Sequence, residues 1–377
     1  MEFITLELRP RLQSCNAFIA VRKDLCLKNV RIKLLESNII LILKDCHIDL
    51  LLPSVKVIPT SLSMLSVINN WICFRLQTAP LESVFGSFST EIVTDTHTSA
   101  VQSSNSQQPF LDNIKLFETS ECIMLCTCCK NVLSKSINFK RFLSLPDLEY
   151  DPDEWFCCKH SSNVMTNLQL QEFDYLYGSC FSVLHKNIFE NHVHIDNKTL
   201  TCNKCLLHIG TLHAYNLFKI WNCCVDYKPQ SNALNIVNAT DPLNDFLILI
   251  KESLSEILGE EIILQTSVGK QIHCLLIKPM DCKLNLITEP NHKVMNIDTI
   301  SLQQKCVAKV LYKYGTSKIT NTNYSNIKHL EVSLPIIEAG LNYLLSSTKR
   351  LPHVYRTVAI DYFLGYIVLQ ELNTIAK

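Results

Sequence analysis

The chain has 377 residues, enough for two or three domains with substantial cores. Lysine and arginine together number 35, and so do aspartate and glutamate, which excludes an overall positive field for nucleic acid. No stretch has the roughly 18 uninterrupted apolar residues of a membrane span, and the first residues lack the pattern of a secretion signal. Together with 18 cysteines, this predicts a cytoplasmic or nuclear protein whose thiols serve metals, packing or chemistry.

The first third of the chain is predicted to be β-structure. Residues 1–93 contain short apolar runs with alternation, such as Ile4, Leu6 and Leu8, separated by turn residues. We expect a β-rich domain, either a sandwich or an open barrel. Residues 94–109 are polar and nearly uncharged, so they are expected to form a loop or linker.

The middle of the chain, residues 110–230, contains two cysteine pairs with metal-ligand spacing. Cys126 and Cys129 form the first pair, and Cys202 and Cys205 form the second. Two such pairs give the four thiolates that a structural zinc site uses. The 72 residues between the pairs favour two knuckle turns brought together by the fold.

Two alternatives remain open for these cysteines. They could be partly buried free thiols, and Cys128 could replace a ligand if the first pair is used in another register. If all four thiolates bind one zinc ion, no coordination position is left for water or substrate. Such a site stabilises the fold and does not catalyse.

A second thiol cluster lies between the two pairs. Trp155, Phe156, Cys157 and Cys158 follow an acidic stretch with two prolines, which predicts an extended excursion. The aromatic side chains could fill a core or anchor a partner. One thiol could instead act as a nucleophile or metal ligand, helped by the adjacent basic residues. A second metal site could combine residues from the list Cys158, His160, Cys180, Cys223 and Cys224.

The last part, residues 231–377, is predicted to be an α+β domain. Asp241 and Pro242 begin an apolar stripe of helical period that ends at Gly259. Strands are expected at residues 262–268, 273–277, 283–287 and 307–312. Two more helices are expected at residues 335–346 and 356–372, each after a Leu-Pro pair. The whole chain is therefore predicted to be α+β, with a β-rich N-terminal region and a central zinc-knuckle segment.

Common catalytic motifs are missing from the sequence. It has no Gly-rich phosphate loop, no Gly-x-Ser-x-Gly elbow and no His-Glu-x-x-His, and only 8 glycines in total. These absences argue against ordinary metabolic enzymes.

Short motifs along nearly the whole chain resemble one known family. They are Glu7-Leu8-Arg9, Leu52-Pro53, Arg75-Leu76-Gln77, the first cysteine pair, Glu154-Trp155 with Cys157, Asp174 with Gly178, the second pair with Gly210, and Lys309-Val310-Leu311-Tyr312. In this order they resemble the HECT-like ubiquitin-conjugating-enzyme-binding family of ubiquitin ligases. The chain departs from the family pattern at Cys158, where histidine is expected.

The resemblance implies a transferase that takes ubiquitin from a conjugating enzyme and passes it to substrate lysines. In that role Cys157 would be the catalytic cysteine, and Trp155, Phe156 and Cys158 would contact the partner. Relatives linked to mRNA 3′-end processing imply an alternative. There the protein would be a non-catalytic assembly factor that inserts this loop into a metallo-endonuclease, with Cys157 on the nuclease's zinc ions.

Overall fold

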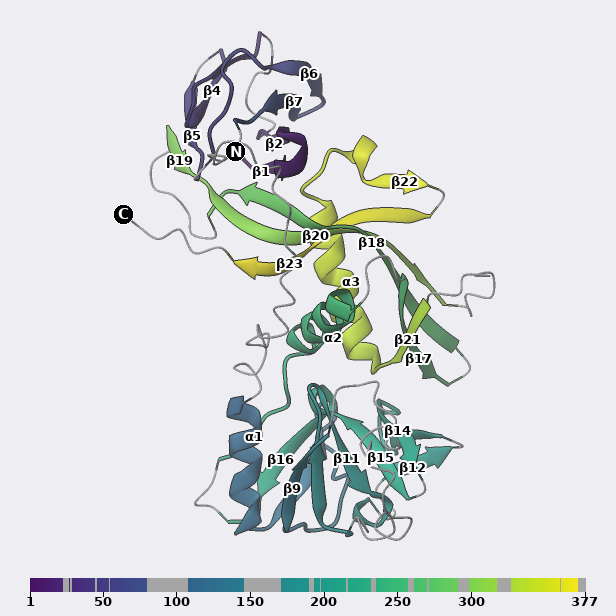
Figure 1. The fold of residues 1–377 in the computed structure, drawn as a ribbon. Coiled ribbons are helices and arrows are strands. Elements are labelled where there is room, and N and C mark those ends of the chain that lie inside the picture. Colours follow the sequence, from purple (N-terminus) through teal and green to yellow (C-terminus); the bar gives the residue numbers. More distant parts are fainter. Residues whose placement is uncertain are drawn as a thin grey trace, which may run out of the picture.

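The molecule is elongated, with three tiers along its length (Figure 1). The computed structural model describes the chain except residues 23–26, 28, 45, 54, 80–107, 146–170, 190–192, 197, 215, 232–234, 257–260, 270, 291–297, 317–326, 360 and 372–377. The N-terminal strands form one end, the long C-terminal strands and two helices form the middle, and the cysteine-rich region forms the other end.

The described residues include three α-helices and 23 strands. The helices are α1 (Gln108–Lys115), α2 (Pro242–Glu256) and α3 (Leu334–Thr348). The N-terminal strands are β1 (Phe3–Arg9), β2 (Ser14–Ala20), β3 (Arg31–Leu34), β4 (Asn38–Ile42), β5 (His47–Leu51), β6 (Ser63–Ile68) and β7 (Trp71–Gln77). The central strands are β8 (Cys122–Cys126), β9 (Arg141–Ser144), β10 (Asp174–Tyr177), β11 (Phe181–His185), β12 (Val193–Asp196), β13 (Thr199–Cys202), β14 (His208–Ala214), β15 (Leu217–Trp221) and β16 (Val225–Pro229). The C-terminal strands are β17 (Glu261–Val268), β18 (Gln271–Thr288), β19 (Thr299–Ser301), β20 (Gln303–Gly315), β21 (Ile327–Glu331), β22 (Thr357–Ala359) and β23 (Tyr362–Glu371).

The largest sheet joins the two ends of the sequence. Its strands run in the order β22-β23-β20-β18-β1-β2-β7-β6, with β17 and β21 added beside β18. Strand β1 pairs with β18 over four residues, from Thr5 opposite Thr288 to Leu8 opposite Asn285. A second sheet, β19-β5-β4-β3, also combines N-terminal strands with a C-terminal one.

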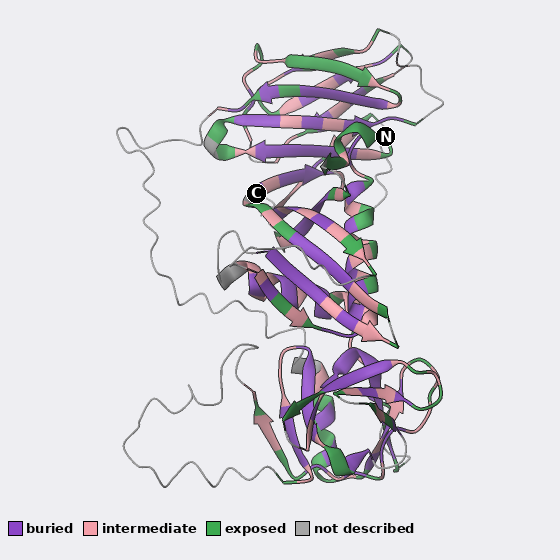
Figure 2. Cartoon of the chain, turned by 90° about the vertical axis from the view of Figure 1, so that its right-hand side faces the viewer, coloured by how far each residue is buried: buried purple, intermediate pink, exposed green. Residues whose placement is uncertain are grey.

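The N-terminal core lies between these two sheets. Alternate residues of β1, which are Ile4, Leu6 and Leu8, pack in one cluster with Ile39 and Leu41 of β4. The β-structure expected for this region follows from that alternation, because one face of each strand meets the core. In Figure 2 the buried positions accordingly alternate with more exposed ones along several strands.

The opposite face of β1 carries a buried charge network. Glu7 is 1% exposed and accepts a hydrogen bond of 2.6 Å from Lys309 Nζ on β20. Tyr366 of β23 donates its hydroxyl to the same oxygen, and Arg9 lies 3.4 Å from the other one. The network therefore connects β1 with β20 and β23 through side chains.

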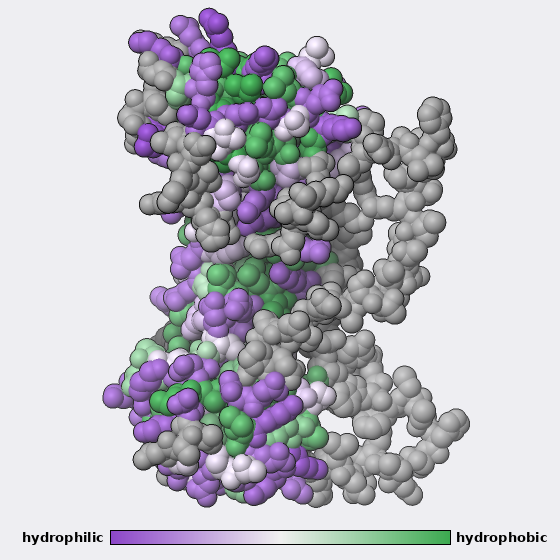
Figure 3. Space-filling view, turned by 90° about the vertical axis from the view of Figure 1, so that its left-hand side faces the viewer, coloured by the Kyte–Doolittle hydropathy of each residue, from purple (hydrophilic) through white to green (hydrophobic). Residues whose placement is uncertain are grey.

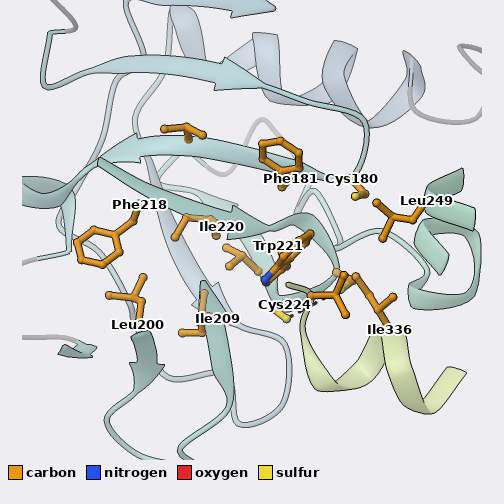
Figure 4. Packing of buried hydrophobic residues seen from close by; sticks show 14 of the residues in the cluster. Cys180, Phe181, Leu200, Ile209, Phe218, Ile220, Trp221, Cys224, Leu249 and Ile336 are labelled. Carbon is orange, nitrogen blue, oxygen red and sulfur yellow. Dashed lines mark hydrogen bonds between the residues drawn. The ribbon is translucent and has the colours of Figure 1, made fainter. Parts of the chain in front are cut away.

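The cysteine-rich region contains a seven-stranded sheet, β12-β13-β14-β15-β11-β10-β9, and the β8–β16 pair. Its core continues into the helices of the middle tier. Figure 4 shows Trp221 and Cys224 beside Ile336 of α3, with Leu249 of α2 close by. The helices themselves pack closely, since a Cβ on Gly340 would lie 2.4 Å from the Phe246 ring.

Most of the expected C-terminal elements are present. The helix expected from Asp241 is α2, the one at 335–346 is α3, and the strands at 262–268 and 307–312 lie in β17 and β20. The segments 273–277 and 283–287 belong to a single strand, β18. It passes Pro279 with register shifts on either side of Asp281, which is how a long strand accommodates proline.

The helix expected at residues 356–372 is wrong. This segment forms β22 and β23, and β23 lies between β22 and β20 in the large sheet. Four consecutive residues from Leu364 to Ile367 are buried, and a fully buried strand has no alternation to distinguish it from a helix. Its aromatic and β-branched residues favour the strand.

The surface of the molecule mixes polar and apolar side chains. On the face shown in Figure 3, hydrophobic side chains gather over the N-terminal sheets among hydrophilic ones. No described helix has the length and apolar character needed to cross a membrane.

Candidate metal centre

Each cysteine pair lies on a tight turn at the end of a strand. Cys126 ends β8, and the Lys130 N–H donates to its carbonyl oxygen at 2.9 Å. Cys202 ends β13, and the Leu206 N–H donates to its carbonyl at 3.0 Å. Lys130 has φ of 56° and Leu206 has φ of 62°, the left-handed conformation that glycine adopts most easily. The two turns are therefore equivalent knuckles, although neither contains glycine.

The fold brings the four predicted sulfur atoms together. Cys126 Sγ lies 3.6 Å from Cys205 Sγ, and Cys129 Sγ lies 3.6 Å from Cys202 Sγ. All four sulfurs are within 4.8 Å of one another. A tetrahedron with zinc–sulfur bonds of about 2.3 Å has edges of about 3.8 Å, whereas a disulfide bond is about 2.05 Å long. The sulfur positions are therefore compatible with a zinc site.

The four-cysteine group is partly covered by protein. Cys126 and Cys202 are buried, and Cys129 and Cys205 are half-buried. Cys128 is exposed and does not belong to the group. A group of four cysteine side chains and no other ligand is typical of a structural zinc site.

Polar groups of both knuckles support the sulfur atoms. Asn131 Nδ2 lies 3.7 Å from Cys202 Sγ and donates to Asn203 Oδ1 at 2.6 Å, so it links one knuckle to the other. Burial opposes ionisation of Cys202, but the backbone N–H groups of Cys205 and Lys204 lower its pKa to about 7. These donors favour the thiolate of Cys202, which is the form that binds zinc, whereas burial raises the pKa of Cys126 and Cys129.

The group connects two sheets that share no strand. The first knuckle continues β8 of the two-stranded sheet, and the second joins β13 to β14 of the seven-stranded sheet. Further contacts hold the first knuckle against β16 and the residues before it. Lys130 Nζ is 2.7 Å from Asp226, and the Thr127 N–H donates to Cys224 O at 3.1 Å.

Gly210 follows the second knuckle at a point where β14 and β15 approach closely. A Cβ at this position would lie 2.1 Å from the backbone oxygen of Lys219. We expect Gly210→Ala to lower the free energy of unfolding by about 2–3 kcal/mol, measured by urea denaturation. Gly315→Ala is the control, because nothing lies within 4 Å of its added Cβ. Equal effects of the two changes would contradict the expected clash.

The excursion that contains the second thiol cluster begins and ends at neighbouring strands. Strands β9 and β10 are parallel, with Arg141 opposite Asp174. The Asp174 carboxylate is 1% exposed and accepts hydrogen bonds from the Arg141 guanidinium, at 2.7 Å from Nε, and from the Gln171 N–H at 2.7 Å. Residues 146–170 connect these strands and lie outside the described residues, and with them Trp155, Phe156, Cys157 and Cys158.

Comparison with known proteins identifies the family. The sequence profile of the HECT-like Ubiquitin-conjugating enzyme (E2)-binding family matches residues 7–363, nearly the whole chain. The chain belongs to this family. The resemblance expected from the sequence motifs is thereby confirmed, and the family description connects the protein with ubiquitin conjugation. No curated protein and no solved structure matches the chain.

Several other thiols of this HECT-like E2-binding protein are poor nucleophiles. Burial raises the pKa of Cys15 and of Cys122 to about 12. Burial likewise raises the pKa of Cys180, and a hydrogen bond with Cys224 raises that of Cys223. Thiols of this kind stay protonated at neutral pH and do not attack thioesters.

The described residues give no support to a second metal site. Among them, the knuckle cysteines are the one group of three or more clustered metal-binding side chains, so Cys180, Cys223 and Cys224 do not complete another. Cys223 Sγ lies 3.4 Å from Ser333 Oγ, in the core of the HECT-like E2-binding fold. Cys158 and His160 lie outside the described residues.

The sequence did not indicate which polar residues support the knuckles and the excursion. Asn131 is two residues after Cys129, so its place inside the knuckle is a local signal that could have been used. Asp226 and Arg141 gave no such signal, because their partners Lys130 and Asp174 are distant in sequence. Asp174 is part of the family pattern, but the sequence did not indicate its role. The structure shows that it forms an ion pair with Arg141 between β10 and β9.

Proposed function

We propose that the protein is a ubiquitin-protein ligase that binds a ubiquitin-conjugating enzyme and passes ubiquitin to substrate lysines. The observation that carries this proposal is the family match over residues 7–363. Cys157 would accept ubiquitin, and Trp155, Phe156 and Cys158 would contact the conjugating enzyme.

Many of the described thiols are unsuited to accept ubiquitin because they are clustered or buried. Four of them form the knuckle group, and others such as Cys122 and Cys180 are fully buried. The ion pair of Arg141 with Asp174 fixes the neighbouring strands from which the Cys157 segment departs.

The proposed transfer takes two steps. The Cys157 thiolate attacks the carbonyl carbon of the thioester between ubiquitin and the conjugating enzyme, and the cysteine of that enzyme leaves as a thiolate. The neutral amine of a substrate lysine then attacks the new thioester. Cys157 leaves as a thiolate, an amide bond forms, and the amine proton passes to water.

A single-turnover assay with a ubiquitin-charged conjugating enzyme tests the role of Cys157. We expect the wild type to form a ubiquitin thioester that reductant removes. Cys157→Ser should form an ester that reductant does not remove. Cys157→Ala should form no adduct. Cys128→Ser, a change at an exposed thiol, is the matched control and should behave as wild type. Normal transfer by Cys157→Ala would show that Cys157 is not the acceptor.

One observation favours a second candidate function. Five acidic residues lie among the eight that precede Trp155, namely Asp147, Glu149, Asp151, Asp153 and Glu154. A segment of this charge suits a cleft built for a polyanion, such as that of the mRNA 3′-end-processing endonuclease, with Cys157 as a ligand to its zinc ions. In this case Cys157→Ala would lose the nuclease in a pull-down from cells, and no ubiquitin adduct would form on the wild type.

We also propose that the knuckle group binds one structural zinc ion. Cys126, Cys129, Cys202 and Cys205 would hold it, and the bound ion would join the two sheets that the knuckles belong to. A site with four thiolates has no open position, so the zinc would contribute stability and no chemical step.

A further inference from the structure

In the described part of the chain, strand β6 is an edge strand of the largest sheet. Among the described strands it pairs only with β7, and it lies at the end of the molecule that the N-terminal strands form (Figure 1). Five of its six residues are exposed, and they include Met64 at 77%, Leu65 at 44% and Val67 at 44%. Residues 57–74 contain no charged side chain. An antiparallel edge strand directs half of its backbone N–H and C=O groups away from its neighbour, where they can pair with another strand.

The other sheet edges in the described part of the chain differ from β6. Several carry charges, namely β3 with Arg31 and Lys33, β9 with Arg141, β12 with Asp196, β16 with Lys228 and β21 with Lys328 and Glu331. Strands β19 and β22 are only three residues long, and β8 is covered by bridges to Val132 and Ile137. Charge, short length, covering and β-bulges are the usual protections against edge pairing. Of these, β6 has only the irregularity between Ser63 and Ser66.

We infer that β6 pairs antiparallel with β6 of a second copy of this chain. If the two-fold axis passes through Ser66, each Leu65 lies opposite Val67 of the other copy, and the two Ser66 residues face each other. Apolar side chains then meet apolar ones, and no charge is placed opposite a like charge. Cross-strand pairs of this kind stabilise antiparallel strands.

The same two-fold pairing, applied to β3, shows why an edge strand without charges is better suited to pair with its own copy. Pairing β3 with its own copy about Ile32 would place Arg31 opposite Lys33, which is destabilising. The regular part of the β6 ladder is short, because the register shifts between Ser63 and Ser66 and Met64 has φ of 55°. The interface is therefore small, and its dissociation constant should be on the order of 10 μM or weaker. Because no charges are involved, the affinity should change little with salt.

Sedimentation over a range of concentrations tests this inference on the full chain. The mass should rise from 43.0 kDa toward twice that value as the concentration increases. Ser66→Lys places two lysines opposite each other and should keep the protein monomeric, and so should Ser66→Glu. An equimolar mixture of the two variants should recover the dimer, because opposite charges then meet across the axis.

The control is Ser346→Lys, which adds the same charge at an exposed serine of α3. This variant should dimerise as the wild type does. A mass of 43.0 kDa for the wild type at every concentration would overturn the inference. Dimerisation of Ser66→Lys at wild-type strength would overturn it as well, since pairing would then use another surface. Because Ser66 is exposed, unchanged thermal unfolding of the variants is expected and verifies that they fold.

Discussion

Removing zinc from the knuckle group is expected to unfold the cysteine-rich region. Purified protein should contain about one zinc ion per chain by elemental analysis, and Cys202→Ser should contain much less. Structural zinc contributes roughly 10 kcal/mol of apparent binding free energy in small zinc domains at neutral pH. Most of this should be lost from the stability of the region, because the ion would join its two sheets.

Calorimetry with and without a chelator measures this effect. The chelated protein should lose the part of its unfolding transition that belongs to the cysteine-rich region. Cys128→Ser is the matched control, since Cys128 lies in the first knuckle but is exposed and outside the group. It should keep the full zinc content and the wild-type transition. A chelated wild type that unfolds as the untreated protein does would refute the structural role of the ion.

Glu7→Gln is expected to destabilise the junction between the N-terminal and C-terminal strands. The change would leave the Lys309 ammonium, whose side chain is 14% exposed, without its counter-charge. Removing one partner of a buried ion pair costs about 3–5 kcal/mol. Denaturant unfolding should show this loss at neutral pH. Glu2→Gln makes the same chemical change at an exposed residue and should alter the stability by less than about 0.5 kcal/mol.

The pH dependence of unfolding tests whether the loss of stability in Glu7→Gln comes from the missing charge of Glu7. Burial alone would raise the pKa of Glu7, but Lys309, Tyr366 and Arg9 lower it below 4.5. An acid whose pKa is lower in the folded state stabilises the fold above its unfolded pKa, and this stabilisation is lost as the pH falls through the folded value. The stability difference between wild type and Glu7→Gln should therefore shrink below about pH 4.5. A constant difference down to pH 3 would contradict this account.

The sequence predicts those parts of the fold that depend on local patterns. Asp241 and the apolar stripe behind it define α2, and the cysteine spacing identifies the four residues that the fold brings together. Strand β23 was mistaken for a helix because its buried residues show no alternation. Two strands were expected on either side of Pro279, but the structure has the single strand β18. The register shift that lets β18 pass Pro279 depends on its pairing in the sheet, so the segment alone does not reveal it.

Long-range partners were beyond the reach of the sequence. Glu7 and Lys309 are 302 positions apart, and nothing near either residue indicates the other. The same is true of Lys130 with Asp226 and of Arg141 with Asp174. Such pairs follow from the order of strands in the sheets, which the order of strands in the sequence does not determine.

The pairing of β1 with β18 has a consequence for synthesis on the ribosome. The first strand emerges early, but its partner, residues 285–288, is translated roughly 280 residues later. At about 5–20 residues per second, β1 remains without this neighbour for roughly 15–60 s. During that time the nascent chain exposes an apolar strand edge to other chains. The N-terminal region therefore completes its fold only after residues 285–288 have been translated, and chaperones that protect nascent chains should bind it until then.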